Sequence, residues 1–333
     1  MNKKYLLFVT LFVLLAAAVL GGSHLYRHYK NEANVLGKYT FAQTRKNIRR
    51  LSHIRLTTAQ NGTVNLYRQG EFWHFKEAAD YFINTDSLAN FYNMVNNSLI
   101  MTAQPAGKKT MADARLLMPN DENTQQTGTR IETFDGDEQL LDDVVIGAML
   151  QDGEYRFARK ADGAYIYTVS HIGTFDGHPQ SWIPYPLLNI KDDMIGALVI
   201  DGKYLDRQLI DDIKPHLPFI RKLTEALNFL NYNGIAAQKD FFKTYPDMKP
   251  QTVKVLTPIG LNYVLNIYFA DDTYWLTVHL QINKIARKEV GAFVDENQKY
   301  FKDWIFQLND EQGSALYDTQ IGEQSDETAE NKE

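Results

Sequence analysis

Alternating apolar and polar residues predict a β-sheet at the start of the polar body. Apolar side chains alternate with polar ones over residues 54–57 and 64–67, and an aromatic-rich run follows at residues 72–75. Between the first two runs, Asn61-Gly62 supplies the two positive-φ residues that a tight hairpin turn requires. The pattern therefore predicts a three-stranded meander.

A helix and a further group of strands are predicted next. Apolar residues recur with the period of a helix that lies on a sheet: Leu88, Phe91, Tyr92, Val95 and Leu99. Residues 104–128 lack a clear period and are interpreted as a loop with one short turn. Strand patterns resume, separated by Asp-Gly turns, at residues 130–134, 140–149, 155–159 and 164–169.

A second, similar series begins near residue 193. It comprises a strand at 195–200, helical segments at 208–217 and 218–230, a long hairpin at 261–282 and a last strand at 304–308. Its first strand, second helix and last strand match earlier elements at offsets of roughly 130–140 residues, which indicates a degenerate internal repeat. The expected fold class is α+β: an N-terminal transmembrane helix, then two related antiparallel-sheet domains with helices packed on one face.

The longest apolar run, YLLFVTLFVLLAAAVLGG, occupies residues 5–22 and contains no charged side chain. At about 1.5 Å per residue, a helix of this length spans about 27 Å, close to the hydrocarbon thickness of a bilayer. We expect an uncleaved membrane anchor (a signal anchor) at residues 1–23. A cleaved signal peptide is the alternative, because small residues follow the apolar core.

Charges on the two sides of this run favour opposite orientations. Lys3 and Lys4 favour a cytoplasmic N-terminus, whereas the positive charges that follow the run favour a cytoplasmic body. Long domains cross a membrane largely regardless of charge. We therefore expect a single-pass protein of the bacterial cytoplasmic membrane, with its N-terminus in the cytoplasm and its body in the periplasm.

Residues 24–50 are predicted to form a basic juxtamembrane stalk. Two interpretations remain open: an ordinary solvated stalk, or contact with anionic headgroups, in which each charge near the surface contributes about 1 kcal/mol. The candidates for lipid contact are Arg27, Lys30, Arg45, Lys46, Arg49 and Arg50. The net charge of −6 for the whole chain argues against nucleic acid as a partner.

Length and composition set the domain plan. A chain of 333 residues is typical of about two domains. We place them at residues 51–190 and 191–318, followed by a disordered acidic tail at 319–333. The chain contains no cysteine, which excludes disulfides, thiolate metal sites and cysteine nucleophiles.

Several segments resemble a known bacterial family. They are the N-terminal run, the meander HIRLTTAQNGTVNLYRQGEFWHF, and DDVVIGAMLQDGEYRFARKADGAYIYTV, in which Gly147 follows an apolar strand. The closing WIFQLNDEQGSAL looks like the family's terminal strand and helix. The family consists of single-span proteins catalogued as a domain of unknown function, often encoded beside ABC transporter components of the gliding-motility type. The resemblance implies a membrane-anchored accessory protein, and it carries over no catalytic residue.

No pattern in the sequence predicts catalysis or a resident metal. His171, Asp176 and His178 have the chemistry of zinc ligands, but their spacing fits a polar loop around Asp176-Gly177. Pairs of adjacent aspartates fit turns and helix starts. Neither a phosphate-binding glycine loop nor a nucleophile elbow occurs. We therefore expect no enzyme activity, no metal and no cofactor.

Aromatic side chains are the candidate surface for a partner or ligand. Trp275 falls on the polar face of its predicted hairpin, and Trp182 and Tyr185 fall in the loop QSWIPYP. Exposed tryptophan is a frequent anchor of binding surfaces. The alternative is that a neighbouring domain covers these residues.

Together these features predict a non-enzymatic, membrane-anchored accessory protein. Its partner would be a membrane protein, an ABC-type permease or a related envelope component, and its N-terminal helix would contact lipid. The alternative is a module that binds cell-wall glycan or lipid through its aromatic residues.

Overall fold

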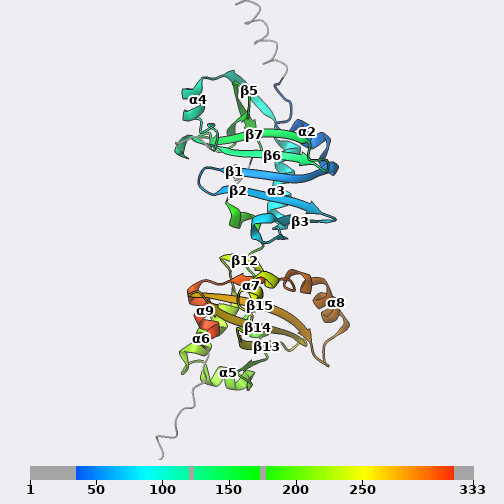
Figure 1. Cartoon of the computed structure of the whole chain (residues 1–333), viewed down its shortest axis with the longest axis vertical. Coiled ribbons are helices and arrows are strands. Elements are labelled where there is room, and N and C mark those ends of the chain that lie inside the picture. The colour runs from blue at the N-terminus through cyan, green and yellow to red at the C-terminus, as the bar shows by residue number, and fades with distance from the viewer. Residues whose placement is uncertain (1–34, 120–123, 173–177, 319–333) are drawn as a thin grey trace, which may run out of the picture. The chain divides into compact units, whose positions relative to one another are not determined.

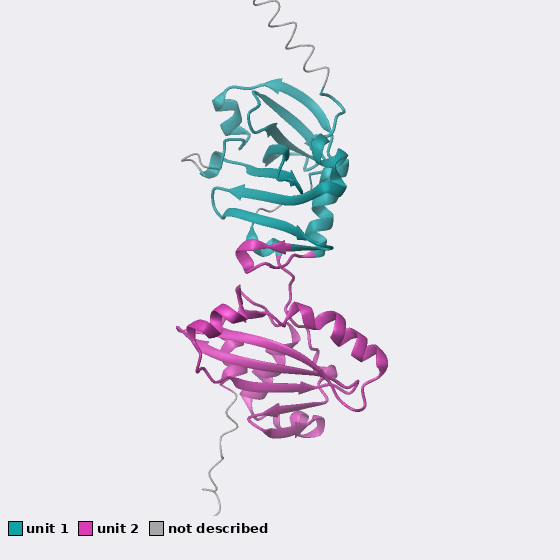
Figure 2. Ribbon diagram, turned by 45° about the vertical axis from the view of Figure 1, so that its right-hand side comes forward, with its two compact units in different colours: residues 1–73, 85–182 teal, residues 74–84, 183–333 magenta. Residues whose placement is uncertain are grey.

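The computed structural model describes residues 35–119, 124–172 and 178–318. Internal contacts divide the chain into two compact units, Met1–Trp73 with Thr85–Trp182 and His74–Asn84 with Ile183–Glu333 (Figure 2). Both units combine an antiparallel sheet with helices, so the expected α+β class is confirmed.

Within the described residues, no helix has both the length and the apolar character needed to cross a membrane. The anchor predicted at residues 1–23 and the tail predicted at 319–333 lie outside those residues.

The first sheet has nine strands among the described residues, in the order β4-β3-β2-β1-β6-β7-β8-β9-β5 (Figure 1). The strands are β1 (Leu51–Thr58), β2 (Gly62–Gln69), β3 (Phe72–Phe75), β4 (Tyr81–Phe82), β5 (Ile100–Pro105), β6 (Thr129–Asp135), β7 (Leu140–Met149), β8 (Tyr155–Lys160) and β9 (Tyr165–Ser170). The helices in this part of the chain are α2 (Ala42–Lys46), α3 (Thr85–Asn97) and α4 (Lys108–Asp113), with short 3₁₀ turns η1 (Ile48–Arg50), η2 (Lys76–Ala78), η3 (Thr124–Gln126) and η4 (Pro179–Trp182).

The core of the first unit follows from the alternation in its strands. Ile54 and Leu56 on β1 are two residues apart, so both point to the same face, and both are fully buried. The helical stripe of α3 contributes Phe91 and Val95, which are 0% exposed. The predicted meander and helix are confirmed as β1, β2, β3 and α3.

Helices lie on both faces of the first sheet. Asp142 on β7 binds Thr44 of α2, whereas Val145, three positions further along β7, packs with Met111 of α4 and with Leu116. Successive side chains of a strand point to opposite faces. The expectation that helices pack on one face is therefore wrong for this unit.

Residues 35–50, predicted as part of a stalk, belong to the folded unit instead. Phe41 and Thr44 are 0% exposed. The backbone of this segment is also paired: Gly37 N donates to Ile100 O at 2.8 Å and Thr40 N donates to Ser98 O at 3.0 Å. The charge pattern suggested a stalk. The segment nevertheless folds onto the unit, because the apolar and hydroxyl groups between its basic residues are buried.

A buried carboxylate holds this segment on the sheet. Asp142 Oδ2 accepts the N–H and the hydroxyl of Thr44, both at 2.8 Å. Its Oδ1 pairs with Lys160 Nζ at 2.8 Å, and the same Nζ donates to Thr40 O at 3.0 Å. One ion pair therefore joins α2, β7 and β8.

The second sheet has seven strands among the described residues, in the order β11-β10-β13-β14-β15-β16-β12. They are β10 (Ala197–Ile200), β11 (Lys203–Asp206), β12 (Gly234–Ala237), β13 (Gln251–Leu256), β14 (Leu261–Ala270), β15 (Thr273–Ile282) and β16 (Trp304–Gln307). The helices are α5 (Arg207–Ile213), α6 (Pro218–Asn228), α7 (Gln238–Thr244), α8 (Lys288–Asn297) and α9 (Asp310–Tyr317), with η5 (Asp192–Met194) and η6 (Gln298–Tyr300).

Residues 74–84 complete an aromatic cluster of the second unit. The ring of Tyr81 meets those of Trp304 and Phe306 edge-on, with centroids 5.1 and 5.5 Å apart. The indole Nε1 of Trp304 donates to Ala79 O at 2.9 Å. Burial raises the pKa of Tyr81 far above its ordinary value, so its hydroxyl stays neutral.

The two sheets share one strand order. The series β2-β1-β6-β7-β8-β9-β5 corresponds, strand for strand and in chain order, to β11-β10-β13-β14-β15-β16-β12. Helices α3 and α6 occupy equivalent places in the chain, as do α4 and α7. The three matches noted in the sequence fall on equivalent elements: β1 with β10, α3 with α6 and β9 with β16.

Several elements were not predicted. Strand β5 lies partly in the region interpreted as a loop, and β12, β13, α7 and α8 were also missed. Strands β5 and β12 each lie at a sheet edge, and each pairs with a strand that is far away in the sequence. Their formation depends on tertiary pairing rather than on a local pattern.

We expect Asp142→Ala to lower the free energy of unfolding of the first unit by about 3 kcal/mol, because it leaves a buried N–H and Lys160 without their carboxylate. Urea denaturation of the full chain in detergent measures this change. Asp137→Ala is the matched control, since that side chain is 77% exposed and its loss should cost under about 0.5 kcal/mol. Equal effects of the two substitutions would contradict the role of Asp142.

Candidate functional site: an arginine-lined pocket

The aromatic residues predicted to form one surface have different environments. Trp182 is 2% exposed, so the prediction that it forms an exposed binding surface is wrong; the turn η4 directs its indole into the core. Trp275 is half-buried against Phe241, with ring centroids 5.3 Å apart. Tyr185 is 58% exposed and meets Phe229 edge-on at 5.3 Å.

The arginines predicted to contact lipid are partly engaged within the protein. The guanidinium of Arg45 lies 3.9 Å from the ring centroid of Tyr39, and Arg50 pairs with Asp135 at 2.7 Å and Asp137 at 3.0 Å. Lys46 and Arg49 are exposed. Arg27 and Lys30 lie outside the described residues.

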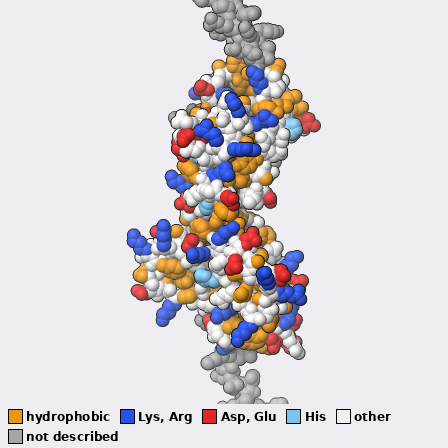
Figure 3. Space-filling view, turned by 90° about the vertical axis from the view of Figure 1, so that its right-hand side faces the viewer, with side chains coloured by type: hydrophobic (Ala, Val, Ile, Leu, Met, Phe, Trp, Pro, Cys, Tyr) orange, Lys and Arg blue, Asp and Glu red, His pale blue; other side chains and the backbone are white. Residues whose placement is uncertain are grey.

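The described residues contain no group of three or more histidine or carboxylate side chains that could hold a metal ion. His171 Nδ1 lies 3.0 Å from Ser170 Oγ, and Asp176 lies outside the described part of the chain. Charges are also interspersed on the face of the molecule shown in Figure 3, where Lys and Arg side chains alternate with Asp and Glu.

The most distinctive feature of the first unit is a polar pocket of about 680 Å³, which we call the arginine pocket. It lies at the end of the sheet where the β1–β2 turn, the start of β6 and the end of β7 meet. Three stretches of chain and two arginines line it: Thr58–Asn61, Thr124 to Thr129 without Gln126, Ile146–Met149, Arg115 and Arg156. Its volume is in the range of small-molecule sites.

Close backbone approaches build this pocket. A Cβ atom on Gly147 would lie 2.3 Å from Ala114 O, and one on Gly128 would lie 2.5 Å from Ile146 O. Ala148 N instead donates to Ala114 O at 2.9 Å, so the chain before Arg115 runs directly against β7. Only glycine permits these approaches, and they place Arg115 at the pocket wall with a positive φ of 55°.

Arg159, which is not a pocket residue, holds the same segment against the sheet. Arg159 on β8 is 6% exposed, and its Nε donates to Leu116 O at 2.7 Å. Its Nη1 also donates to Lys160 O at 3.1 Å and to Ala161 O. These contacts with backbone carbonyls hold the chain next to Arg115 in place.

The two arginines of the pocket differ from Arg159 in lacking partners. Arg156 Nε is buried and makes no hydrogen bond, and neither Arg115 nor Arg156 forms an ion pair within the described residues. Burial lowers the pKa of Arg156, because desolvation disfavours its charged form and no acid offsets it. The residues that line the pocket include no aspartate or glutamate.

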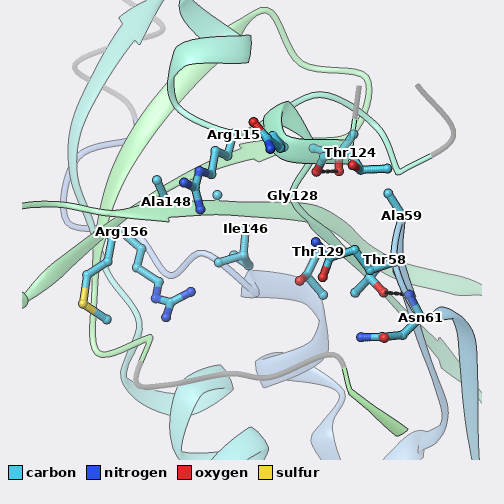
Figure 4. Close-up of a pocket in the computed structure, with 15 residues that line it drawn as sticks. Thr58, Ala59, Asn61, Arg115, Thr124, Gly128, Thr129, Ile146, Ala148 and Arg156 are labelled. Carbon is cyan, nitrogen blue, oxygen red and sulfur yellow. Dashed lines mark hydrogen bonds between the residues drawn. The ribbon is translucent and has the colours of Figure 1, made fainter. Parts of the chain in front are cut away.

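Hydroxyl and amide groups face these cations. In Figure 4 the guanidinium groups of Arg115 and Arg156 lie on the side of the pocket near Ala148, and Thr58, Asn61 and Thr129 lie on the other side. The Thr58 hydroxyl accepts from Asn61 N at 3.0 Å, which leaves its own hydrogen free to donate. The arrangement therefore presents several hydrogen-bond donors and two positive charges.

The second unit has aromatic rings at the position that corresponds to Gly147. Aligning YIYTV at 165–169 with WIFQL at 304–308 and following the ladder partners gives the equivalent series Tyr167–Ala158–Ile146 and Phe306–Leu276–Ile267. Gly147 therefore corresponds to Tyr268, which is 7% exposed. Tyr268 packs with Phe241 and Phe242 at centroid distances of 5.9 and 5.3 Å. In the first unit the same place is taken by the backbone at Ala114 and by Leu116.

Sequence reasoning did not find this site. Arg115 and Arg156 stand alone in the sequence, with no motif around them, and the pocket assembles only when distant turns and strand ends meet. The one available signal was Gly147, noted after an apolar strand.

Comparisons with known proteins return no match to a protein-family model, a curated protein or a solved structure. The resemblance to single-span bacterial proteins of unknown function therefore stays a prediction.

We expect Gly147→Ala to lower the free energy of unfolding of the first unit by about 2–3 kcal/mol, because overpacking forces the backbone at Ala114 away from β7. Urea denaturation measures the loss. Gly136→Ala is the control, since its new Cβ meets nothing within 4 Å. A Gly147→Ala protein as stable as the control would show that the close approach does not constrain this site.

Proposed function

We propose that the protein is a non-enzymatic binding subunit that is anchored to the bacterial cytoplasmic membrane by residues 5–22 and exposes both units to the periplasm. The observation that carries the binding role is the arginine pocket. It combines two cationic side chains with hydroxyl and amide groups, and its lining has no histidine, carboxylate, lysine or serine that would act as a general base or nucleophile. Such a lining favours holding a ligand over transforming it.

The membrane anchor and the partner come from the sequence. The run at residues 5–22 is long enough to span a bilayer, and the resemblance points to an ABC-type permease or a related envelope component as the partner. The shared strand order supports the idea that the two units arose by duplication of one α+β domain. On this view, the repeats diverged afterwards, for example at the equivalent positions Gly147 and Tyr268.

A cell-wall glycan- or lipid-binding module is the second candidate function. The observation that favours it is the exposed Tyr185, which is 58% accessible and supported by Phe229. Exposed aromatic rings are suitable platforms for sugar rings. Trp182 does not support this candidate, because it is buried.

Purification of the tagged full chain in mild detergent tests the accessory role. We expect near-stoichiometric recovery of a permease or of its ATPase, identified by mass spectrometry. A variant that lacks residues 5–22 is the control and should lose these partners. Recovery of the full chain alone, at several detergent strengths, would contradict the accessory role and favour wall or lipid binding.

Cysteine labelling tests the orientation, because the natural chain has no cysteine. We expect Glu289→Cys, at an exposed position of α8, to react with a membrane-impermeant maleimide once the outer envelope is made permeable. The parent chain without cysteine gives the background. Labelling that appears only after the cytoplasmic membrane is lysed would place the body in the cytoplasm.

A further inference from the structure

We propose that the arginine pocket binds an anionic sugar: one phosphate or carboxylate group held by Arg156 and Arg115, attached to a hydroxylated body. This inference rests on the binding role proposed above and names the ligand class. It concerns the first unit alone.

The charge balance of the pocket supports an anion. Partly buried arginines elsewhere in the chain have partners: Arg130 pairs with Asp143 at 2.7 Å, and Arg159 donates to Leu116 O at 2.7 Å. Arg156 is the exception, since its buried Nε has no hydrogen-bond acceptor. Taking a cation out of water without a partner is unfavourable. Because Nε itself is buried, a phosphate or carboxylate in the pocket would pair with the terminal N–H groups of the Arg156 guanidinium, in the bidentate geometry that it favours, and would offset its charge.

The remaining lining points to a hydroxylated ligand. Apart from the arginines and glycines, the polar lining residues are Thr58, Gln60, Asn61, Thr124, Gln125, Thr127 and Thr129. The apolar side chains are confined to Ala59, Ile146, Ala148 and Met149. A lipid tail or an aromatic ring offers no hydrogen-bond partner to these hydroxyl and amide groups. Sugar hydroxyls, which both donate and accept, do.

The arginine pocket belongs to the first unit alone, because all of its lining residues fall between residues 58 and 156. The second unit places Tyr268 where the first has Gly147, and Phe241, Phe242 and Trp275 pack around that tyrosine. Binding through the arginine pocket should therefore show a stoichiometry of one.

Isothermal titration calorimetry on the full chain in detergent tests the proposal. The probes are glucose 6-phosphate and glucuronate as anionic sugars, glucose as the neutral sugar and inorganic phosphate as the bare anion. We expect an anionic sugar to bind with a stoichiometry of one. Glucose and inorganic phosphate should each bind at least about 10-fold more weakly, because each lacks one half of the recognised chemistry.

Substitutions locate the binding. Arg156→Gln should weaken binding of the anionic sugar by about 10- to 100-fold, because a charge-assisted hydrogen bond is lost. Arg156→Lys keeps the charge and should recover part of the affinity. Arg221→Gln is the matched control, since that arginine lies on α6 of the second unit and is 61% exposed. Circular dichroism and thermal melting confirm that each variant is folded.

Three results would overturn the proposal: no binding of either anionic sugar, binding unchanged by Arg156→Gln in a folded protein, or inorganic phosphate binding as tightly as glucose 6-phosphate. Detergent purification of the parent chain, compared with its sugar binding, separates this inference from the proposed function. Recovery of the membrane partner without sugar binding by the parent chain would reject the ligand and keep the accessory role. Loss of the partner from the parent chain itself would reject the accessory role.

Discussion

The ion pair between the buried carboxylate of Asp142 and the partly exposed Lys160 is the constraint on which the first unit depends. The carboxylate is 3% exposed and accepts the N–H and hydroxyl of Thr44, so it orders the segment that follows the N-terminal apolar run. Since the same pair joins β7 to β8, one interaction fixes both the position of Thr44 and the alignment of these two strands. The pair acts together with the backbone bonds of Gly37 to Ile100 and of Thr40 to Ser98, which join the same segment to the sheet.

Strand β7 also shapes the pocket at its other end. Its regular pairing ends near Gly147, where the missing side chain lets the backbone at Ala114 hydrogen-bond to Ala148. Arg159 then fastens that segment through Leu116 O. Arg159 on β8 thus donates to three backbone carbonyls, whereas Nε of Arg156 on the same strand makes no hydrogen bond. This difference between neighbouring arginines is the observation on which the proposed ligand site rests.

The sequence predicted what local patterns determine. The alternation of β1, β2, β14 and β15 is encoded in neighbouring residues, so these hairpins were found. The tight turn predicted at Asn61-Gly62 was wrong in detail, because the loop between β1 and β2 comprises residues 59–61 and only Gly62 of the two has a positive φ. Strands β5 and β12 pair only with distant partners, so no local pattern predicts them. Helix α2 lies in a stretch rich in basic residues, which gave no sign that Thr44 is buried. The pocket was missed for the same reason, because Arg115 and Arg156 meet only in the folded chain. Trp182 was misjudged because a loop position does not reveal whether a ring turns inward.

The repeats diverge at the strand that borders the pocket. The second unit buries Tyr268 among Phe241, Phe242 and Trp275, whereas the first unit has Gly147 at the equivalent position, closely approached by the backbone at Ala114. Burying an aromatic ring contributes far more to stability than a glycine does. The close approach also holds the chain before Arg115 against β7, at the wall of a cavity lined by two arginines that form no ion pair within the described residues. Such a loss of packing together with an uncompensated charge is the arrangement expected where binding, rather than stability, is selected.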